Sequence, residues 1–323
     1  MNPMKLVVAD GDVLARILAE THEIWSDRLT PPAYARYNAA QLLTPWGARH
    51  LRRFALLDDQ RRILSSAKRY DLRASFDGRE IRVIGLGAVF TPEAMRGRGY
   101  AREIIERILA DAAREGAQMA LLFSEIDPGF YEAMGFTAVP RHEQLVRTCG
   151  PRGAPMVLVR AGEDRDIPAV TALARAMAAP HRLALVPTED SIRFSLSKKR
   201  LLAGFLTPGA LSVEFYIVEE GASAVAFAIV TVTIDDAVLE MCGDRDPSGA
   251  RVGALLQVLH ARTPAEARPK LACFLPPGWL PPQLEIERSA LVREVMMIRP
   301  LAAGLITAPL SERDVLYWHG DLI

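Results

Sequence analysis

The sequence has 323 residues, of which 50% are hydrophobic and 24% are charged. This length suits two domains of ordinary size, and this composition excludes a disordered chain. The 39 basic and 39 acidic residues cancel, which argues against nucleic acid as a partner, because nucleic-acid binders carry a basic excess. The longest apolar stretches, such as residues 224–230, fall short of the roughly 20 residues that span a bilayer. We therefore expect a globular protein with neither nucleic acid nor a membrane as its partner.

The three cysteines, Cys149, Cys242 and Cys273, are far apart, odd in number and without a pairing pattern. The six histidines show no metal-ligand spacing. The first thirty residues lack the basic start and apolar run of a secretion signal. These features predict a cytoplasmic protein with no disulfide framework and no metal site.

Helix and strand patterns are mixed in the first half of the chain, as in an α+β fold. Taken in order, the patterns predict helices over residues 12–25 and 31–43, strands over 51–57, 63–76 and 81–91, a long helix over 99–115, a strand over 119–124, a short helix over 129–134, and further strands to about residue 148. Asp77-Gly78 between the second and third strands is a strong signal for a tight hairpin. We expect a twisted, mostly antiparallel sheet flanked by helices.

The second half repeats this order. Residues 4–9 and 156–161 both read as strands that run into helices, and they begin 152 residues apart. Gly97 and Gly249, which open glycine-containing helix starts, are also 152 residues apart. The strand patterns at 119–123 and 270–274 have nearly the same spacing. Three matches in register indicate a duplication. Glycine and proline punctuate residues 149–155, so we expect two tandem domains, residues 1–150 and 151–323.

The segment 89–101 is the part of the first half that points most clearly to a ligand. A strand ends near Thr91, a loop containing Gly97 and Gly99 follows, and an amphipathic helix begins, with Ile104, Ile105, Ile108, Leu109, Ala112 and Ala113 on its apolar side. Two glycines let the backbone approach a ligand closely, and the free N–H groups at a helix start attract anions. Arg96 and Arg98 add positive charge, so the loop is suited to a phosphate or diphosphate.

Two other phosphate-binding loops fit less well. A Rossmann turn requires a third glycine, which Tyr100-Ala101 does not supply, and a Walker loop requires Gly-Lys-Ser/Thr, which is absent. Instead, Arg96-Gly-Arg-Gly-Tyr-Ala101 resembles the Q/R-x-x-G-x-G/A signature of the GNAT superfamily of N-acetyltransferases. Tyr131-Glu-Ala-Met-Gly-Phe136 resembles the Tyr-x-x-x-Gly-Phe segment of the same superfamily. The resemblance covers roughly residues 4–148.

This resemblance implies acetyl-CoA as co-substrate, no metal, and a set of residues that would hold the coenzyme: Val89, Phe90, Thr91, Arg96, Gly97, Arg98, Gly99, Tyr100, Ala101 and Ser124. Ser124 stands where the family often has an asparagine that contacts the pantetheine arm. In the second half the same offset pairs Arg96 with Ser248 and Gly99 with Arg251. We therefore expect a degenerate second domain that does not bind the coenzyme, as in two-domain members such as mycothiol synthases.

The resemblance also implies direct attack of an amine on the thioester, with Tyr131 as the acid that protonates the departing sulfur. Glu125 and Asp127, and less directly Glu93, are candidates for the base that accepts the amine proton. Glu125 and Asp127 could instead cap the short helix or be solvated loop acids. The acceptor is expected to be a small-molecule or peptide amine, and the protein a monomer or homodimer. The alternatives are a non-catalytic acyl-CoA-binding sensor, and transfer of a longer acyl group or to an atom other than nitrogen.

Three further groups of residues are predicted to be structural. Trp25, Tyr34, Tyr37 and Trp46 lie on a segment that covers the acceptor site in this family, but aromatic residues at this spacing are more often core. Residues 198–200 (Lys-Lys-Arg) read as a solvated basic face. The apolar segment 318–323 is expected to dock on a domain surface.

Overall fold

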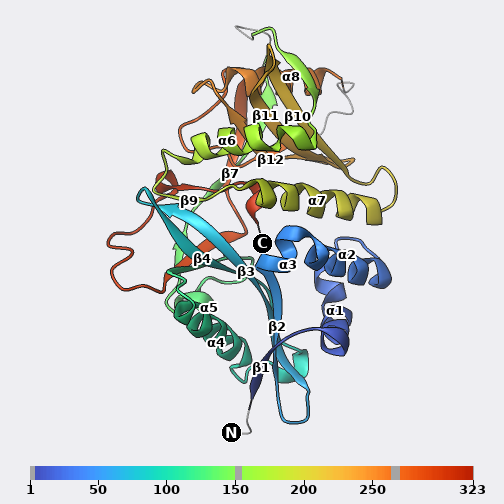
Figure 1. Ribbon diagram of the computed structural model, residues 1–323, viewed down its shortest axis with the longest axis vertical. Coiled ribbons are helices and arrows are strands. Elements are labelled where there is room, and N and C mark those ends of the chain that lie inside the picture. The colour runs from blue at the N-terminus through green and yellow to red at the C-terminus, as the bar shows by residue number, and fades with distance from the viewer. Residues whose placement is uncertain (1–3, 150–154, 263–269, 323) are drawn as a thin grey trace.

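The computed structural model describes residues 4–149, 155–262 and 270–322, which form two lobes of mixed helices and strands (Figure 1). The first lobe contains, in chain order, β1 (Lys5–Val8), α1 (Gly11–Trp25), α2 (Pro31–Leu43), α3 (Pro45–His50), β2 (Leu51–Leu57), β3 (Ile63–Phe76), β4 (Arg79–Phe90), α4 (Tyr100–Arg114), β5 (Met119–Ser124), α5 (Gly129–Glu132) and β6 (Thr137–Val139). The chain then continues through β7 (His142–Thr148), β8 (Leu158–Ala161), α6 (Ile167–Ala178), β9 (Leu183–Leu185), α7 (Glu189–Phe205), β10 (Ser212–Glu220), β11 (Ser223–Val232), β12 (Asp236–Asp244), α8 (Ala250–Ala261), β13 (Lys270–Cys273), β14 (Leu284–Leu291), β15 (Val295–Pro300) and β16 (Val315–Leu316). Short 3-10 turns cover Glu93–Met95, Asp164–Asp166, Glu312–Asp314 and His319–Asp321.

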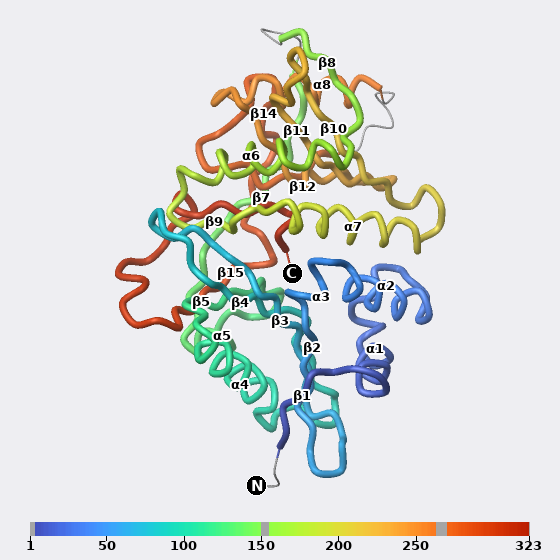
Figure 2. The backbone as a smooth tube through the Cα atoms, in the orientation of Figure 1, coloured from blue at the N-terminus to red at the C-terminus, as the bar shows by residue number. Residues whose placement is uncertain are grey.

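The described strands form two sheets, and each sheet takes in strands from the other half of the chain. The first sheet has the order β1-β2-β3-β4-β5-β15-β6, so β15 from late in the chain lies between β5 and β6. The second has the order β14-β7-β13-β12-β11-β10-β8, so β7 from the first half lies between β13 and β14. The exchange crosses the predicted boundary near residue 150. Because each sheet contains an interior strand from the other half of the chain, the two lobes are joined through their sheets (Figure 2).

Short-range sequence signals predicted most elements well. Helix α4 covers one face of the first sheet with buried Ile104, Ile105, Ile108, Leu109 and Ala112, as its apolar stripe indicated, whereas Ala113 is exposed. The hairpin between β3 and β4 turns at Asp77 and Gly78, whose φ angles of 46° and 75° are those of the favoured two-residue turn. The mixed, mostly antiparallel α+β fold is confirmed.

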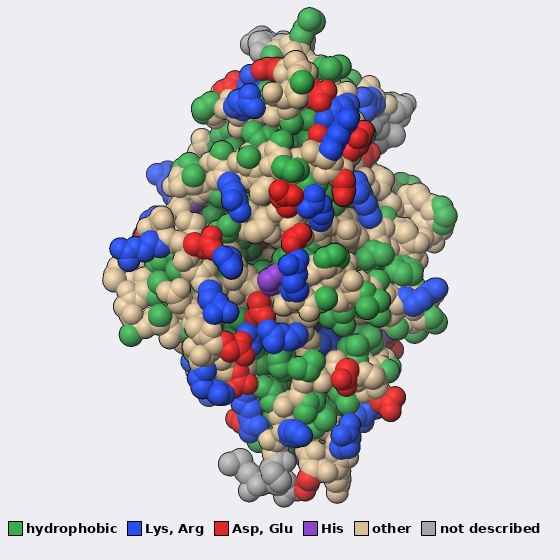
Figure 3. All heavy atoms as spheres, in the orientation of Figure 1, with side chains coloured by type: hydrophobic (Ala, Val, Ile, Leu, Met, Phe, Trp, Pro, Cys, Tyr) green, Lys and Arg blue, Asp and Glu red, His purple; other side chains and the backbone are tan. Residues whose placement is uncertain are grey.

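The lobes meet along α7, which lies between them, directly above α2 and α3 in the view of Figure 1. Strand β9 extends the first sheet by pairing with β3, and β16 pairs with β9. The C-terminal segment also docks here: Trp318 is 3% exposed, and Lys198 Nζ on α7 lies 3.5 Å from the carbonyl oxygen of Leu322. The predicted docking of the tail is thus confirmed for residues 318–322, and Ile323 lies outside the described residues. On the face shown in Figure 3, basic and acidic side chains are interspersed, in keeping with the zero net charge.

Candidate active site

The loop between β4 and α4 has a run of unpaired backbone N–H groups. Gly97 and Gly99 have φ angles of 73° and 80°, in the left-handed region where a side chain would be strained, and a Cβ at either position would meet nothing within 4 Å. Arg96 N bonds to Glu93 O and Glu103 N bonds to Gly99 O, but the N–H groups of residues 97–102 have no acceptor in the described parts of the chain. These groups lie at the positive end of a 15-residue helix. The loop is therefore an open anion-binding cradle, that is, a set of unpaired N–H groups at residues 97–102 that an anion can reach.

Two arginines flank this cradle. Arg96 and Arg98 are both exposed, and the Arg96 Nε donates to the carbonyl oxygen of Thr91 at 3.3 Å, which holds the side chain beside the loop. Tyr100 and Ala101 begin α4 and are half-buried. The combination of free amides, a helix N-terminus and two guanidinium groups is suited to a diphosphate.

The first sheet opens beside this loop. Strands β4 and β5 are parallel and pair from Val83 with Met119 to Leu86 with Leu122, but no further. Beyond that point β4 bulges against β3, and Ala88 has a φ of 47°, a left-handed conformation that is costly for a residue with a Cβ. Bulges of this kind re-aim backbone groups next to functional sites. A thioester could enter between the two strands here.

Three of the sequence-predicted coenzyme residues lie on the bulged end of β4 or directly after it. Val89 and Thr91 are half-buried and Phe90 is buried. Ser65 on β3 fastens this segment, because its hydroxyl donates to the carbonyl oxygen of Phe90 at 2.8 Å and contacts the Thr91 hydroxyl at 3.1 Å. Ser124, at the end of β5, is buried, and its hydroxyl donates to Ile126 O at 3.0 Å. The structure thus brings the predicted residues to one edge of the opening.

Tyr131 is buried on α5, with 7% of its surface exposed. Its ring packs edge-on against Phe130 and Phe136, at centroid distances of 5.0 and 5.9 Å. Burial raises the pKa of its phenol above the ordinary value of 10.0. Its hydroxyl donates to no group among the described residues. At neutral pH it is therefore a protonated group with a hydrogen to donate.

The two predicted carboxylates differ in their surroundings. Asp127 is exposed, and its Oδ1 accepts the N–H of Gly129 at 2.8 Å, so it caps α5. Glu125 is also exposed, but it lies next to Glu294, a residue that the sequence reasoning missed. Glu93 is exposed at the start of a 3-10 turn.

Glu294 reaches this site through the strand exchange. Val295 pairs with Ser124 across β15 and β5, which places Glu294 beside Glu125. The pKa of Glu294 is raised, first by burial and then by the negative charges of Glu125 and Glu143. No local motif surrounds Glu294, and only knowledge of the β5–β15 pairing could have identified it.

A pocket of about 310 Å³ lies on the other side of the first sheet from α4, between the lobes, and Trp46, Tyr70, Phe194 and Lys198 are among the residues that line it. The interpretation of residues 198–200 as a solvated face is therefore wrong for two of them: Lys198 is half-buried in this pocket, and Lys199 forms an ion pair with Glu240 at 2.7 Å. Helix α7 presents these side chains to the interior because it packs between the lobes.

The aromatic residues of the early helices divide into two groups. Tyr34 and Tyr37 are buried in a core cluster of the first lobe, as expected for structural residues. Trp46 stacks on Phe194 with ring centroids 4.4 Å apart and lines the pocket, and Trp25 packs edge-on against Phe90 at 6.5 Å. Trp46 therefore lies at the pocket between the lobes, and Trp25 lies beside Phe90 at the opening of the first sheet.

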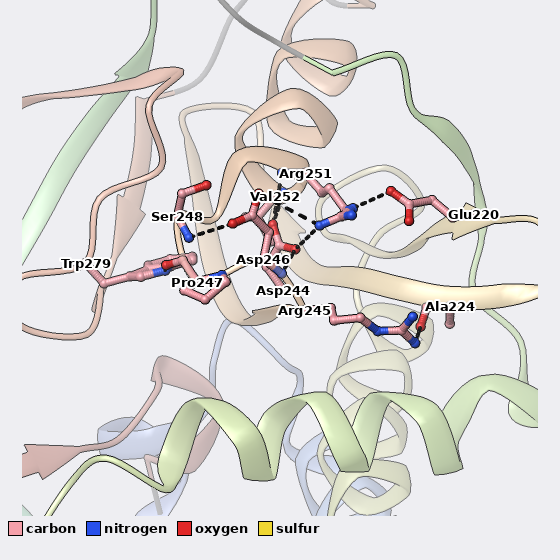
Figure 4. Close-up of polar contacts among 10 residues, drawn as sticks. All are labelled: Glu220, Ala224, Asp244, Arg245, Asp246, Pro247, Ser248, Arg251, Val252 and Trp279. Carbon is pink, nitrogen blue, oxygen red and sulfur yellow. Dashed lines mark hydrogen bonds and ion pairs between the residues drawn. The ribbon is translucent and has the colours of Figure 1, made fainter.

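The equivalent loop of the second lobe is closed (Figure 4). Gly249 precedes α8 as Gly99 precedes α4, and both are left-handed, with φ angles of 73° and 80°. The predicted pairing of Gly99 with Arg251 is thus wrong by two positions, and Arg96 corresponds to Asp246 rather than to Ser248. A Cβ at Gly249 would lie 2.4 Å from Trp279, so the indole covers the space that is open in the first lobe.

Side chains of the second lobe already occupy its helix N-terminus. The buried Asp244 Oδ2 accepts the N–H groups of Arg251 and Val252 at 2.9 and 3.1 Å, and Asp246 Oδ1 accepts that of Ser248 at 2.9 Å. Figure 4 shows both carboxylates turned toward the start of α8. Two acidic groups in an anion site repel phosphate, which explains in physical terms why this loop would not bind a coenzyme.

Comparison with known proteins agrees with this arrangement. Residues 32–139 match the family model of an acetyltransferase (GNAT) domain. Similar solved structures are a GCN5-related N-acetyltransferase from Kribbella flavida (15% identity, TM-score 0.69, 94% of this chain and 72% of that one), one from Anabaena variabilis (10%, 0.68, 94% and 74%), and an Enterococcus faecalis protein of unknown function described as a probable N-acyltransferase (12%, 0.69, 93% and 73%). At these identities the likeness concerns the fold.

No curated protein matches the sequence. Within residues 4–149, 155–262 and 270–322, no helix is long and apolar enough to cross a membrane. Over the same ranges, no three His, Cys, Asp or Glu side chains gather as a metal site would require.

Proposed function

We propose, from the match of residues 32–139 to the acetyltransferase (GNAT) domain, that the chain is an N-acetyltransferase that moves the acetyl group of acetyl-CoA directly to a primary amine of a small molecule or peptide in the cytoplasm. The observation that carries the proposal is the contrast between the two helix N-termini. The N–H groups of residues 97–102 are free, whereas their counterparts in the second lobe bond to Asp244 and Asp246. A single coenzyme site in the first lobe follows.

The residues present fit the coenzyme in this site. The free amides and Arg96 and Arg98 would hold the diphosphate, and the gap between β4 and β5 beyond Leu86 would admit the pantetheine arm and its thioester. Ser124 could supply one hydroxyl contact to that arm, because its oxygen retains acceptor capacity while donating to Ile126.

The reaction would form one bond and break another at the thioester carbon. The neutral amine nitrogen attacks this carbon, the new C–N bond forms, and the C–S bond breaks with its electron pair going to sulfur. Tyr131 would donate its phenolic proton to that sulfur, and backbone N–H groups of Val89–Thr91 would stabilise the negative oxygen. The products are the N-acetylated amine and CoA.

The excess proton of the attacking amine needs an acceptor. We place this role on the Glu125–Glu294 pair rather than on Asp127, because Asp127 is engaged as a helix cap. A carboxylate whose pKa is raised toward neutrality is a better base than an ordinary surface carboxylate. Since an alkyl ammonium has a pKa near 10.4, deprotonating the amine at pH 7 requires about 4–5 kcal/mol of free energy, and the base has to help to supply it.

The rival function is a sensor that binds acyl-CoA without turnover. Both functions predict coenzyme binding, so the deciding experiment is release of free CoA thiol in the presence of acetyl-CoA and a panel of primary amines. An enzyme releases thiol in proportion to the amine supplied. A binding module takes up acetyl-CoA and releases none beyond the hydrolysis seen without amine, and that result would overturn the proposal.

A further inference from the structure

Three cationic side chains gather on the face of the first sheet that is turned away from α4. Arg53 on β2 lies directly opposite Lys68 on β3, and Lys68 in turn lies opposite Gly87 on the bulged part of β4. Lys198 comes from α7 on the second lobe, close enough to Lys68 for their charges to interact. Arg53, Lys68 and Lys198 are called the cation cluster below. Like charges directly opposite one another on a sheet are destabilising.

The cation cluster lacks the carboxylate partners that its neighbours have. Arg69, next to Lys68, forms an ion pair with Asp71 at 2.8 Å, and Lys199, next to Lys198, pairs with Glu240 at 2.7 Å. Among the described residues, none of the three members forms such a pair. The negative charge of the exposed Asp27 acts on both Lys68 and Lys198, and that of Glu240 acts on Lys198 as well.

Arg53 has the clearest unpartnered polar atom of the cation cluster, although Tyr34 hydrogen-bonds elsewhere on its side chain. Its side chain is buried, with 4% of the residue exposed, and its Nη1 has no hydrogen-bond partner. It lines a cavity of about 10 Å³ together with Lys68 and Gln41, whose buried Oε1 is also unpartnered. Such a cavity has room for about one oxygen-sized group. Leaving a buried guanidinium N–H without a partner is unfavourable, so an oxygen supplied here by a ligand would be bound favourably.

We propose that the cation cluster binds the carboxylate of the amine acceptor, so that the acceptor is an amino acid or a compound that carries an amine and a carboxylate in the same way. The inference rests on the proposed function. Gly85 and Gly87 lie opposite Tyr70 and Lys68, so at these two positions β4 has no side chain that would stand between an acceptor and the strand. The cavity beside Arg53 suits one carboxylate oxygen better than the three oxygens of a phosphate.

The placement of charges supports the same acceptor. β3, which carries Lys68, flanks β4 on one side of the opening, and β15, which Glu294 immediately precedes, flanks β5 on the other. A ligand that spans the opening therefore meets cations at one end and carboxylates at the other. A carboxylate directed to the first and an ammonium to the second satisfy both.

The test compares acetylation of L-amino acids with that of the corresponding L-amino acid amides, by thiol release from acetyl-CoA. The full chain is assayed as wild type and as Lys68→Met and Lys198→Met, which remove a charge while keeping a similar length. Arg200→Met is the matched control, because Arg200 lies on the same helix and is exposed. Calorimetric binding of acetyl-CoA to each variant establishes that the first lobe is intact.

The wild type is expected to prefer the acids, and each lysine variant is expected to raise the KM for acids at least tenfold while changing kcat and the KM for amides little. Equal use of acids and amides, acetylation of carboxylate-free amines alone, or bound acetyl-CoA with no turnover of any amino acid would overturn the inference. Lack of acetyl-CoA binding would instead show that the proposed function itself is wrong. If amino phosphates were turned over better than amino acids, the cation cluster would bind a phosphate and not a carboxylate, and this result would also overturn the inference.

Discussion

Gly99 and Gly249 hold the same left-handed position in front of α4 and α8, yet only Gly99 faces open space. The indole of Trp279 would lie 2.4 Å from a Cβ on Gly249, and Asp244 and Asp246 accept the N–H groups that follow. The backbone shape of an anion site thus persists in both lobes. The site is open in the first lobe, whereas acidic and aromatic side chains fill it in the second.

Replacing Asp244 by Ala should destabilise the second lobe without creating a second coenzyme site. Its fully buried carboxylate caps α8 through two N–H groups, so we expect a loss of about 2–4 kcal/mol in the free energy of unfolding. Trp279 still covers the loop, so the stoichiometry should stay at one acetyl-CoA per chain. Urea unfolding and calorimetry measure the two quantities, with exposed Asp235→Ala as the control. Two coenzymes bound to the wild-type chain would refute the closed second site.

Tyr131→Phe should lower kcat by about 10²-fold or more and change the affinity for acetyl-CoA little, because the phenol donates a proton only as sulfur departs. Burial raises the pKa of Tyr131 above 10.0, so the phenol stays protonated and the wild-type rate should not decline between pH 7 and 10 on its account. Steady-state kinetics test both points, with Tyr216→Phe in the second lobe as the control. Unchanged kcat in Tyr131→Phe would remove this residue from the acid role.

Glu294→Gln should abolish the acidic limb of the pH–rate profile. A base acts when deprotonated, so activity falls as the pH drops through its pKa, which for Glu294 lies above the ordinary 4.5 because of burial and the charge of Glu125. Glu125→Gln removes that charge and should move the limb to lower pH. Exposed Glu20→Gln should leave it in place. If Glu294→Gln keeps the wild-type profile, the base is another group.

Binding of a carboxylate ligand should weaken above about pH 8. Burial, and after it the positive charge of Lys199, lower the pKa of Lys198 to about 8, while Asp27 and Glu240 oppose this shift. Lys198 is therefore charged below about pH 8 and neutral above it. Burial also lowers the pKa of Lys68 well below its ordinary value. Calorimetry with an N-acetylated amino acid, which has no ionisable amine, measures the effect. Lys198→Met should bind weakly at every pH, whereas Arg200→Met should keep the wild-type profile; a flat wild-type profile would be the contrary result.

The features that the sequence predicted are those determined by neighbouring residues. The Asp77-Gly78 turn, the apolar stripe of α4 and the glycine loop at residues 96–101 depend on a few adjacent positions, so their patterns are readable. The exchange of β7 and β15 depends on pairing between segments far apart in the chain, and no local pattern reports it.

The same distinction explains the errors at the site. Glu294 becomes a neighbour of Glu125 only through the β5–β15 pairing. Lys198 reads as a surface residue in a polar run, and it becomes interior only because α7 packs between the lobes. The repeat offset was wrong by two residues at Gly249, because the connections in the two halves differ in length while the glycine keeps its place before the helix.

The most direct measurement of the central claim is calorimetric titration of the full chain with acetyl-CoA, compared between wild type, Gly99→Val and Gly209→Val. Gly209 has a φ of 83° with nothing within 4 Å of a Cβ, so the control introduces a similar backbone strain away from the loop. We expect one binding site per chain in the wild type and in Gly209→Val, and no measurable heat in Gly99→Val. No heat in the wild type at millimolar coenzyme, or undiminished binding in Gly99→Val, would contradict the account.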